Sequence, residues 1–162
     1  MRIGDCEADF VLSGKNGKGI LLVVVCRKSR AVFIERIIEV GVKAVRGAFG
    51  RIKKRFPEMK TITADNDLLL QKHKELGTFL GVKMYFCDPY SSWQKGSIEN
   101  ANKNIRKDIP KGSDISKYSG YRIKKVEKKL NNRIMECAGF FTPYEVLEKH
   151  RKRKKRLRAL KK

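Results

Sequence analysis

The spacing of hydrophobic and polar residues predicts three consecutive strands at the start of the chain. Residues 6–12 alternate, with one apolar face and a second face that carries Asp9. Residues 20–26 (ILLVVVC) are apolar without a break, which is typical of a strand buried on both faces. Residues 31–38 (AVFIERII) are expected to form a third strand. Because only short turns separate these segments, we expect an antiparallel meander.

The period of the pattern then changes from two residues to between three and four. Residues 42–56 carry apolar side chains at helical spacing, and this pattern stops before Pro57. Residues 60–64 predict a fourth strand. A strand–helix–strand unit of this length predicts that the fourth strand runs parallel to the first. A short helix over 71–80 and a fifth strand over 82–87 follow.

The stretch WQKGSIENANKNIR (93–106) combines a loop with a polar helix. Trp93 is a large apolar anchor for the loop, and we expect Ser97 to be the N-cap of a helix over residues 98–107. One face of that helix carries a carboxylate, amides and cations, a set that suits a metal ion beside a phosphodiester. A solvated polar helix is the alternative explanation.

Two more helices are expected in the last third of the chain. Apolar residues at helical spacing predict one that ends near residues 131–133, and residues 142–145 (TPYE) form a capping box that starts the other. The second helix is expected to fray beyond Leu147. We divide the chain into a core, 1–148, and a basic tail, 149–162. The order of elements predicts an α/β, ribonuclease-H-like domain, a five-stranded mixed sheet flanked by helices.

The charge balance narrows the class of partner. The chain has 39 Lys and Arg against 17 Asp and Glu, a net charge of +22, which points to a polyanion such as nucleic acid. No segment approaches the roughly 20 apolar residues that span a bilayer, and the first residues lack a signal-peptide core, so we expect a cytoplasmic protein and no membrane. The cysteines lack zinc-site spacing and are expected to be reduced and structural; they are Cys6, Cys26, Cys87 and Cys137.

Three carboxylates are placed for chemistry on phosphodiesters. Asp9 lies on the first strand and Asp65 directly follows the fourth, so the two are neighbours if those strands are adjacent. Glu99 arrives from the polar helix. Clustered carboxylates repel one another unless a cation holds them, and oxygen ligands favour Mg²⁺ or Mn²⁺. Two such ions, about 3.5–4 Å apart, activate water or a 3′-OH. Each carboxylate alone has a structural explanation, as a surface, turn or helix-start residue.

With these residues, the sequence resembles the catalytic domain of bacterial DDE transposases and integrases, most closely the insertion-sequence-thirty family. The matching segments, in the family's order, are CEADFV around Asp9, RKSR at 27–30, TADN around Asp65, GVKMYFCDPYSSWQKGSIENANKNIR at 81–106, LNNR at 130–133 and TPYEV at 142–146. Between Asp65 and Glu99 stand residues 66 to 98, which are 33 residues and the interval of this family.

The resemblance implies a site and an activity. Asp9, Asp65 and Glu99 would be the catalytic, metal-binding triad, with two Mg²⁺ or Mn²⁺ ions; Asp5 is a nearby competitor for the first position. The activity would be DNA strand cleavage and transfer of 3′-OH ends to target DNA, by a homo-oligomer on transposon ends in the prokaryotic nucleoid. The residues expected to contact DNA are Asn66, Lys95, Asn102, Lys103 and Arg106.

Two departures from the family and two rival functions remain open. Asp67 and Leu69 stand where the family has a glycine and a glutamate, and Leu69 is expected to weaken activity. The sequence begins almost at the first catalytic strand, so we expect the family's N-terminal helix-turn-helix to be absent and the chain to be a truncated or decayed copy. The rivals are a non-catalytic, basic DNA-binding remnant and a related nuclease that hydrolyses without strand transfer.

Overall fold

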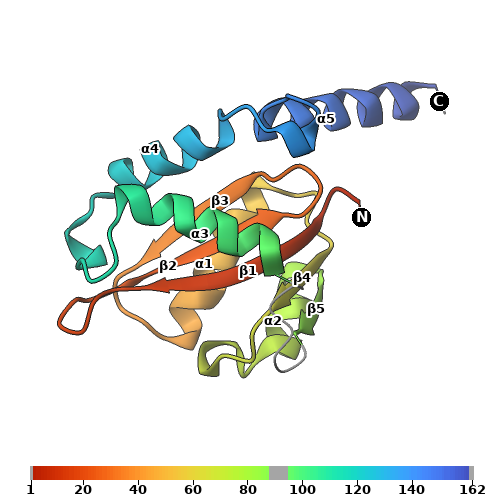
Figure 1. The fold of residues 1–162 in the computed structure, drawn as a ribbon. Coiled ribbons are helices and arrows are strands. Elements are labelled where there is room, and N and C mark those ends of the chain that lie inside the picture. Colours follow the sequence, from red (N-terminus) through yellow and green to blue (C-terminus); the bar gives the residue numbers. More distant parts are fainter. Residues whose placement is uncertain (1, 88–94, 161–162) are drawn as a thin grey trace.

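Five strands form one mixed sheet in the order β3-β2-β1-β4-β5 (Figure 1). The computed structural model describes residues 2–87 and 95–160. The strands are β1 Asp5–Leu12, β2 Ile20–Cys26, β3 Val32–Ile37, β4 Thr61–Ala64 and β5 Lys83–Phe86. The first three form the predicted antiparallel meander, and β4 lies parallel to β1, as the crossover predicts. The predicted five-stranded mixed sheet is therefore confirmed.

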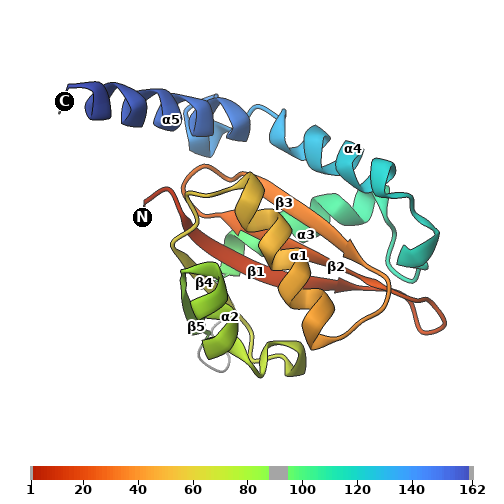
Figure 2. The ribbon, with the colours of Figure 1, turned by 180° about the vertical axis from the view of Figure 1, so that it is seen from behind.

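Helices cover both faces of this sheet, so its central strands are buried on both sides (Figures 1 and 2). One face packs against α1 and α2, and the other against α3 and α4. The helices are α1 Val42–Arg55, α2 His73–Leu80, α3 Gly96–Asp108, α4 Gly120–Asn131 and α5 Pro143–Ala159, with short 3₁₀ turns at Leu68–Leu70, Ile115–Lys117 and Glu136–Ala138. The helix predicted over residues 71–80 begins only at His73, and a separate 3₁₀ turn, Leu68–Leu70, precedes it.

The alternation along β1 divides its side chains between the two layers. Cys6 and Ala8 lie in the core under α1, whereas Val11 lies in the core under α3. Because side chains alternate along a strand, Asp9 shares the α3 face with Val11, as the pattern predicted. The described cysteines are all free thiols, as expected, although Cys137 is exposed and takes no part in a core.

The basic tail continues α5 instead of fraying beyond Leu147, so that prediction is wrong. The Thr142 capping box starts the helix as predicted, and the helix reaches Ala159. Arg151 pairs with Glu58 at 2.8 Å and fixes the middle of α5 to the body of the protein. Beyond Arg151 the helix is exposed and runs out past the sheet (Figure 1). Lysine, arginine and leucine are good helix formers, and cations near a helix C-terminus suit its dipole.

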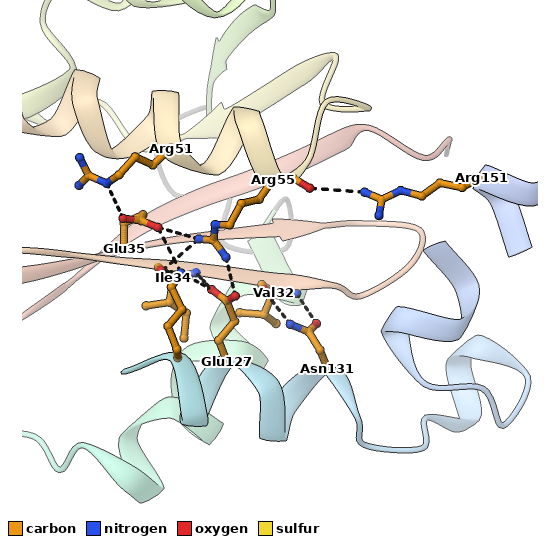
Figure 3. Close-up of polar contacts among 9 residues, drawn as sticks. Val32, Ile34, Glu35, Arg51, Arg55, Glu127, Asn131 and Arg151 are labelled. Carbon is orange, nitrogen blue, oxygen red and sulfur yellow. Dashed lines mark hydrogen bonds and ion pairs between the residues drawn. The ribbon is translucent and has the colours of Figure 1, made fainter. Parts of the chain in front are cut away.

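Side chains of α4 occupy the outer edge of β3 (Figure 3). Asn131 accepts from the Val32 N–H at 2.8 Å and donates to the Val32 carbonyl at 2.7 Å. Glu127 accepts from the Ile34 N–H, and its other oxygen pairs with Arg55 of α1 at 2.5 Å. These contacts supply partners to backbone groups that an edge strand otherwise leaves to water. They also join α4 to α1 around the edge of the sheet.

We expect Glu127→Ala to lower the free energy of unfolding by about 2–3 kcal/mol. The change leaves the buried Ile34 N–H without its acceptor and removes a carboxylate from the Arg55 guanidinium. Urea denaturation of the purified chain measures the loss. Lys128→Ala, on the exposed side of the same helix, is the control and should change stability by less than about 0.5 kcal/mol. Equal effects of the two changes would contradict this account of the β3 edge.

Candidate active site

Asp9 and Asp65 lie side by side because β1 and β4 are adjacent and parallel. The register pairs Glu7 with Thr63, and two more residues along each strand bring Asp9 level with Asp65. Both carboxylates line a cavity of about 200 Å³ at this end of the sheet. The side chain of Asp65 is 60% exposed and that of Asp9 is 30% exposed, so the pair opens to solvent on the Asp65 side. The structure thus brings together two of the three predicted catalytic residues.

The carboxylate of Asp9 is held by two donors. The Phe10 N–H donates to Oδ1 at 2.9 Å, and the side-chain amide of Asn102, on α3, donates to Oδ2 at 2.9 Å. Burial raises the pKa of Asp9 above its ordinary value, although the positive charge of Lys95 acts in the opposite direction. Asn102 therefore contacts a predicted catalytic residue. Its own Oδ1 is buried, with no hydrogen-bond partner among the described residues.

The ammonium of Lys95 lies between the two aspartates. Its Nζ is 2.5 Å from Asp65 Oδ2 and 4.0 Å from Asp9 Oδ1, and the residue is only 7% exposed. Burial by itself lowers the pKa of a lysine, but the hydrogen bond to Asp65 and the charge of Asp9 outweigh burial and raise the pKa of Lys95. The repulsion expected between clustered carboxylates is thus offset by a cation from the chain itself.

Glu99 lies in the first turn of α3, on an exposed position. Asn102 is the third residue after Glu99 along α3, so both share the helix face that reaches Asp9. Across residues 2–87 and 95–160, no three His, Cys, Asp or Glu side chains are gathered closely enough to hold a metal ion, so Glu99 stands apart from the aspartates. Trp93, the predicted anchor of the preceding loop, lies outside the described residues.

The start of α3 differs from the predicted one. The helix begins at Gly96, with Lys95 as its N-cap residue, so Ser97 lies inside the first turn. The Ser97 hydroxyl instead accepts from the guanidinium of Arg30. The prediction of Ser97 as N-cap is therefore wrong. The Arg30 contact comes from the turn between β2 and β3, which is distant in sequence from α3.

Glu7 holds the N-terminus of α3 onto β1, a role that the sequence pattern did not reveal. The residue is 3% exposed, its Oε2 accepts from the Ile98 N–H at 2.8 Å, and its Oε1 pairs with Arg27 Nε at 2.9 Å. A carboxylate here satisfies one of the free N–H groups of the first helical turn and suits the helix dipole. Glu7 thereby fixes the residue that precedes Glu99. The sequence did offer one sign of this role, because Glu7 stands two residues before Asp9 and therefore on the same face of β1.

We expect Glu7→Ala to loosen the first turn of α3 more than Glu7→Gln does. Alanine leaves the buried Ile98 N–H without an acceptor, at a cost of about 1–3 kcal/mol, whereas glutamine keeps a carbonyl oxygen in place. Hydrogen exchange at Ile98, together with urea denaturation, measures the difference. Equal protection of the Ile98 amide in Glu7→Ala and the unmutated chain would contradict this role.

The remaining residues predicted to contact DNA differ in accessibility. Asn66 is exposed next to Asp65, and Lys103 is exposed on α3. Arg106 is partly buried, and its guanidinium donates to the Leu12 carbonyl at 2.9 Å and to the Pro110 carbonyl at 3.4 Å. In this structure Arg106 therefore ties the end of α3 to the end of β1.

Asp5, the competitor for the first catalytic position, lies at the opposite end of β1 from the cavity. Its carboxylate pairs with Arg2 at 3.0 Å and accepts from the Thr61 hydroxyl at 3.0 Å.

The two residues that depart from the family pattern have structural roles. Asp67 caps the 3₁₀ turn by accepting from the Leu69 N–H at 2.7 Å, and the Leu69 side chain packs against the core.

A second cavity, of about 830 Å³, lies on the other flank of α3. Its lining combines Arg27, Arg30 and Arg133 with apolar residues such as Phe140. Neither Asp9 nor Asp65 is part of this lining. The larger of these two cavities is therefore not the one that contains the paired carboxylates.

Sequence comparison identifies relatives of this chain. It is 40% identical over 145 residues to the transposase of insertion sequence element IS4351 from Bacteroides fragilis, covering 89% of this chain and 44% of that transposase. It is 35% identical over 149 residues to transposase InsI of element IS30A from Escherichia coli K12, covering 91% and 38%. Its homologues include insertion-sequence transposases. The chain spans less than half the length of these relatives. No protein-family model matches it.

Solved structures agree on the fold of this transposase homologue. The catalytic core domain of BIV integrase superposes with a TM-score of 0.72 at 20% identity, covering 94% of this chain and 99% of that domain. A simian T-cell lymphotropic virus intasome, in complex with a PP2A regulatory subunit, gives a TM-score of 0.71 at 16% identity, with coverages of 90% and 54%. The fold is the ribonuclease-H-like integrase core, as predicted. Among the described helices, none is long and apolar enough to cross a bilayer.

Proposed function

We propose that this chain is the catalytic core of an insertion-sequence transposase that cuts DNA strands and transfers 3′-OH ends to target DNA. The observation that carries the proposal is the meeting of Asp9, on β1, with Asp65, directly after the adjacent parallel strand β4, beside the helix that bears Glu99. Homology to transposases and the integrase-core fold support this choice of chemistry. The three carboxylates are proposed as the catalytic and metal-binding residues.

The arrangement fits a divalent metal ion. A cation already lies between Asp9 and Asp65, namely the Lys95 ammonium, so the position suits a positive charge. The donors are hard oxygens, which favour Mg²⁺ or Mn²⁺, and Asn102 Oδ1 is a further oxygen nearby that lacks a partner among the described residues. Bound at Asp9, Asp65 and Glu99, one or two such ions would supply the Lewis acidity that activates a water or 3′-OH and stabilises the leaving oxygen.

The chain's own residues would orient the reacting groups. Asn102 fixes Asp9 through its amide, and Glu7 fixes the start of α3, and with it the backbone next to Glu99. Asn66, Lys103 and Arg106 are proposed to contact DNA phosphates around the cavity, with the net charge of +22 supporting a polyanionic partner. Assembly as a homo-oligomer on transposon ends, in the nucleoid, belongs to the same proposal.

A strand-transfer assay with pre-cleaved ends tests this function. Labelled duplexes that end in a free transposon 3′-OH are incubated with target plasmid and Mn²⁺ or Mg²⁺, and the products are separated by size. The proposal expects metal-dependent joined products. Hydrolysis without joining would favour the related nuclease, and binding without any metal-dependent product would favour the DNA-binding remnant.

A further inference from the structure

Lys95 occupies the position between the carboxylates that the proposed metal chemistry needs. Its ammonium contacts Asp65 Oδ2 at 2.5 Å and lies 4.0 Å from Asp9 Oδ1. A divalent ion with near-ideal geometry binds such oxygens at about 2.0–2.1 Å. The ammonium and a metal ion therefore compete for the same oxygen atoms, and their like charges oppose joint occupancy.

The backbone of Lys95 lies at the start of α3, whereas its side chain can reach solvent. Lys95 is the N-cap residue of α3, one turn from the Ile98 N–H that Glu7 holds. The side chain is 9% exposed, but its partner Asp65 is 60% exposed, so the carboxylate pair faces solvent on that side. A lysine head group on four flexible carbons can turn from Asp65 toward solvent by rotamer changes, with α3 remaining in place.

We propose that Lys95 is an internal cation that holds Asp9 and Asp65 together in the metal-free protein, and that metal entry displaces it onto a phosphate of the bound DNA. This inference rests on the proposed function, because it concerns the same carboxylates. The exchange explains why a buried lysine lies at the proposed metal site, since an ammonium that stayed there would only weaken metal binding. The ammonium released by the metal is a compact charge that suits a phosphate oxygen.

The exchange gives a defined expectation for metal binding. We expect Lys95→Met to bind Mn²⁺ at least about tenfold more tightly than the unmutated chain, because no ammonium has to leave the site. In EDTA the same variant should melt at a lower temperature, since the two carboxylates lose their shared cation. Titration calorimetry with Mn²⁺ alone and thermal denaturation measure the two effects. Lys95→Gln, which also lacks the charge, serves as a second variant should methionine prevent folding.

A control separates exchange from a general loss of positive charge. Lys107→Met removes the same charge from an exposed position at the far end of α3. It should leave Mn²⁺ affinity and the EDTA melting temperature at the unmutated values. Equal Mn²⁺ affinity in Lys95→Met and the unmutated chain would overturn the exchange while leaving the metal site standing. An absence of Mn²⁺ binding in every variant would overturn both the exchange and the proposed function.

DNA binding tests where the ammonium goes. The probe is a short duplex without transposon-end sequence, whose 3′ ends are dideoxy-terminated so that no 3′-OH is available for joining. In EDTA the aspartates hold Lys95, so the unmutated chain and Lys95→Met should show the same slope of log K against log[salt]. In Mn²⁺ the unmutated slope should be steeper than that of the variant by about 0.9, the value for one phosphate contact. The same slope for both proteins in Mn²⁺, or an equal difference in EDTA, would overturn the transfer of Lys95 to DNA.

Discussion

Asp65→Asn is expected to abolish metal-dependent strand joining while leaving DNA affinity equal or slightly higher. The change removes one charged oxygen ligand from the pair that Asp9 and Asp65 form, and it removes a negative charge from a surface proposed to hold phosphates. We expect joining to fall by at least about 100-fold. Joined products on gels and equilibrium binding to the same duplex measure the two effects separately.

A neighbouring residue provides the matched control. Asp67→Asn makes the same chemical change two residues away, where the side-chain oxygen caps the 3₁₀ turn through the Leu69 N–H. Asparagine keeps that oxygen, so joining should persist in Asp67→Asn. Robust joining by Asp65→Asn would remove Asp65 from the proposed triad. Loss of joining in both variants would point to a disturbed turn in place of a lost ligand.

The fold was predictable because local pattern and global topology agree. The unbroken apolar run 20–26 is the central strand β2, buried on both faces, and the alternation along 6–12 places Asp9 under α3. The crossover through residues 42–56 made β4 parallel to β1 and so brought Asp65 to Asp9. Handedness and chain length leave few other arrangements for such a unit.

Contacts between distant segments account for what the sequence pattern missed. Ser97 is a good capping residue by type, but Arg30 takes its hydroxyl, while Glu7 binds the helix start instead. Lys95 was expected to contact DNA, and its pairing with both aspartates depends on three separate elements meeting in space. Likewise, the attachment of α5 to the body of the protein depends on Arg151 and its distant partner, Glu58.

Removal of Lys152–Lys162 is expected to weaken DNA binding for all sequences alike. The segment carries eight cations, which are Lys152, Lys154, Lys155, Lys161, Lys162, Arg153, Arg156 and Arg158. Phosphate contacts position DNA without reading its sequence, and each contact that is lost should flatten the slope of log K against log[salt] by about 0.9. The truncation stops after Arg151, because Arg151 and Glu58 hold α5 to the body. Stability should therefore remain nearly unchanged.

Titration of end-containing and scrambled duplexes at several salt concentrations measures this effect. A full-length variant with glutamine at the same eight positions is the control, because it removes the charges and keeps good helix formers. Its slope should match that of the truncated chain. A hundredfold preference of the unmutated chain for one sequence would show that it reads bases directly, and would contradict binding through phosphates alone.

The occupied edge of β3 limits how copies of this chain can associate. The N–H groups of Val32 and Ile34 are hydrogen-bonded to Asn131 and Glu127, so a strand from another molecule could not pair with these two donors. Extension of the sheet through β3 would first require these hydrogen bonds to break, and such extension is a common route to aggregation. A contact between copies along Val32 to Ile34 would therefore be made by side chains, and this stretch of the edge is not available as a template for fibres.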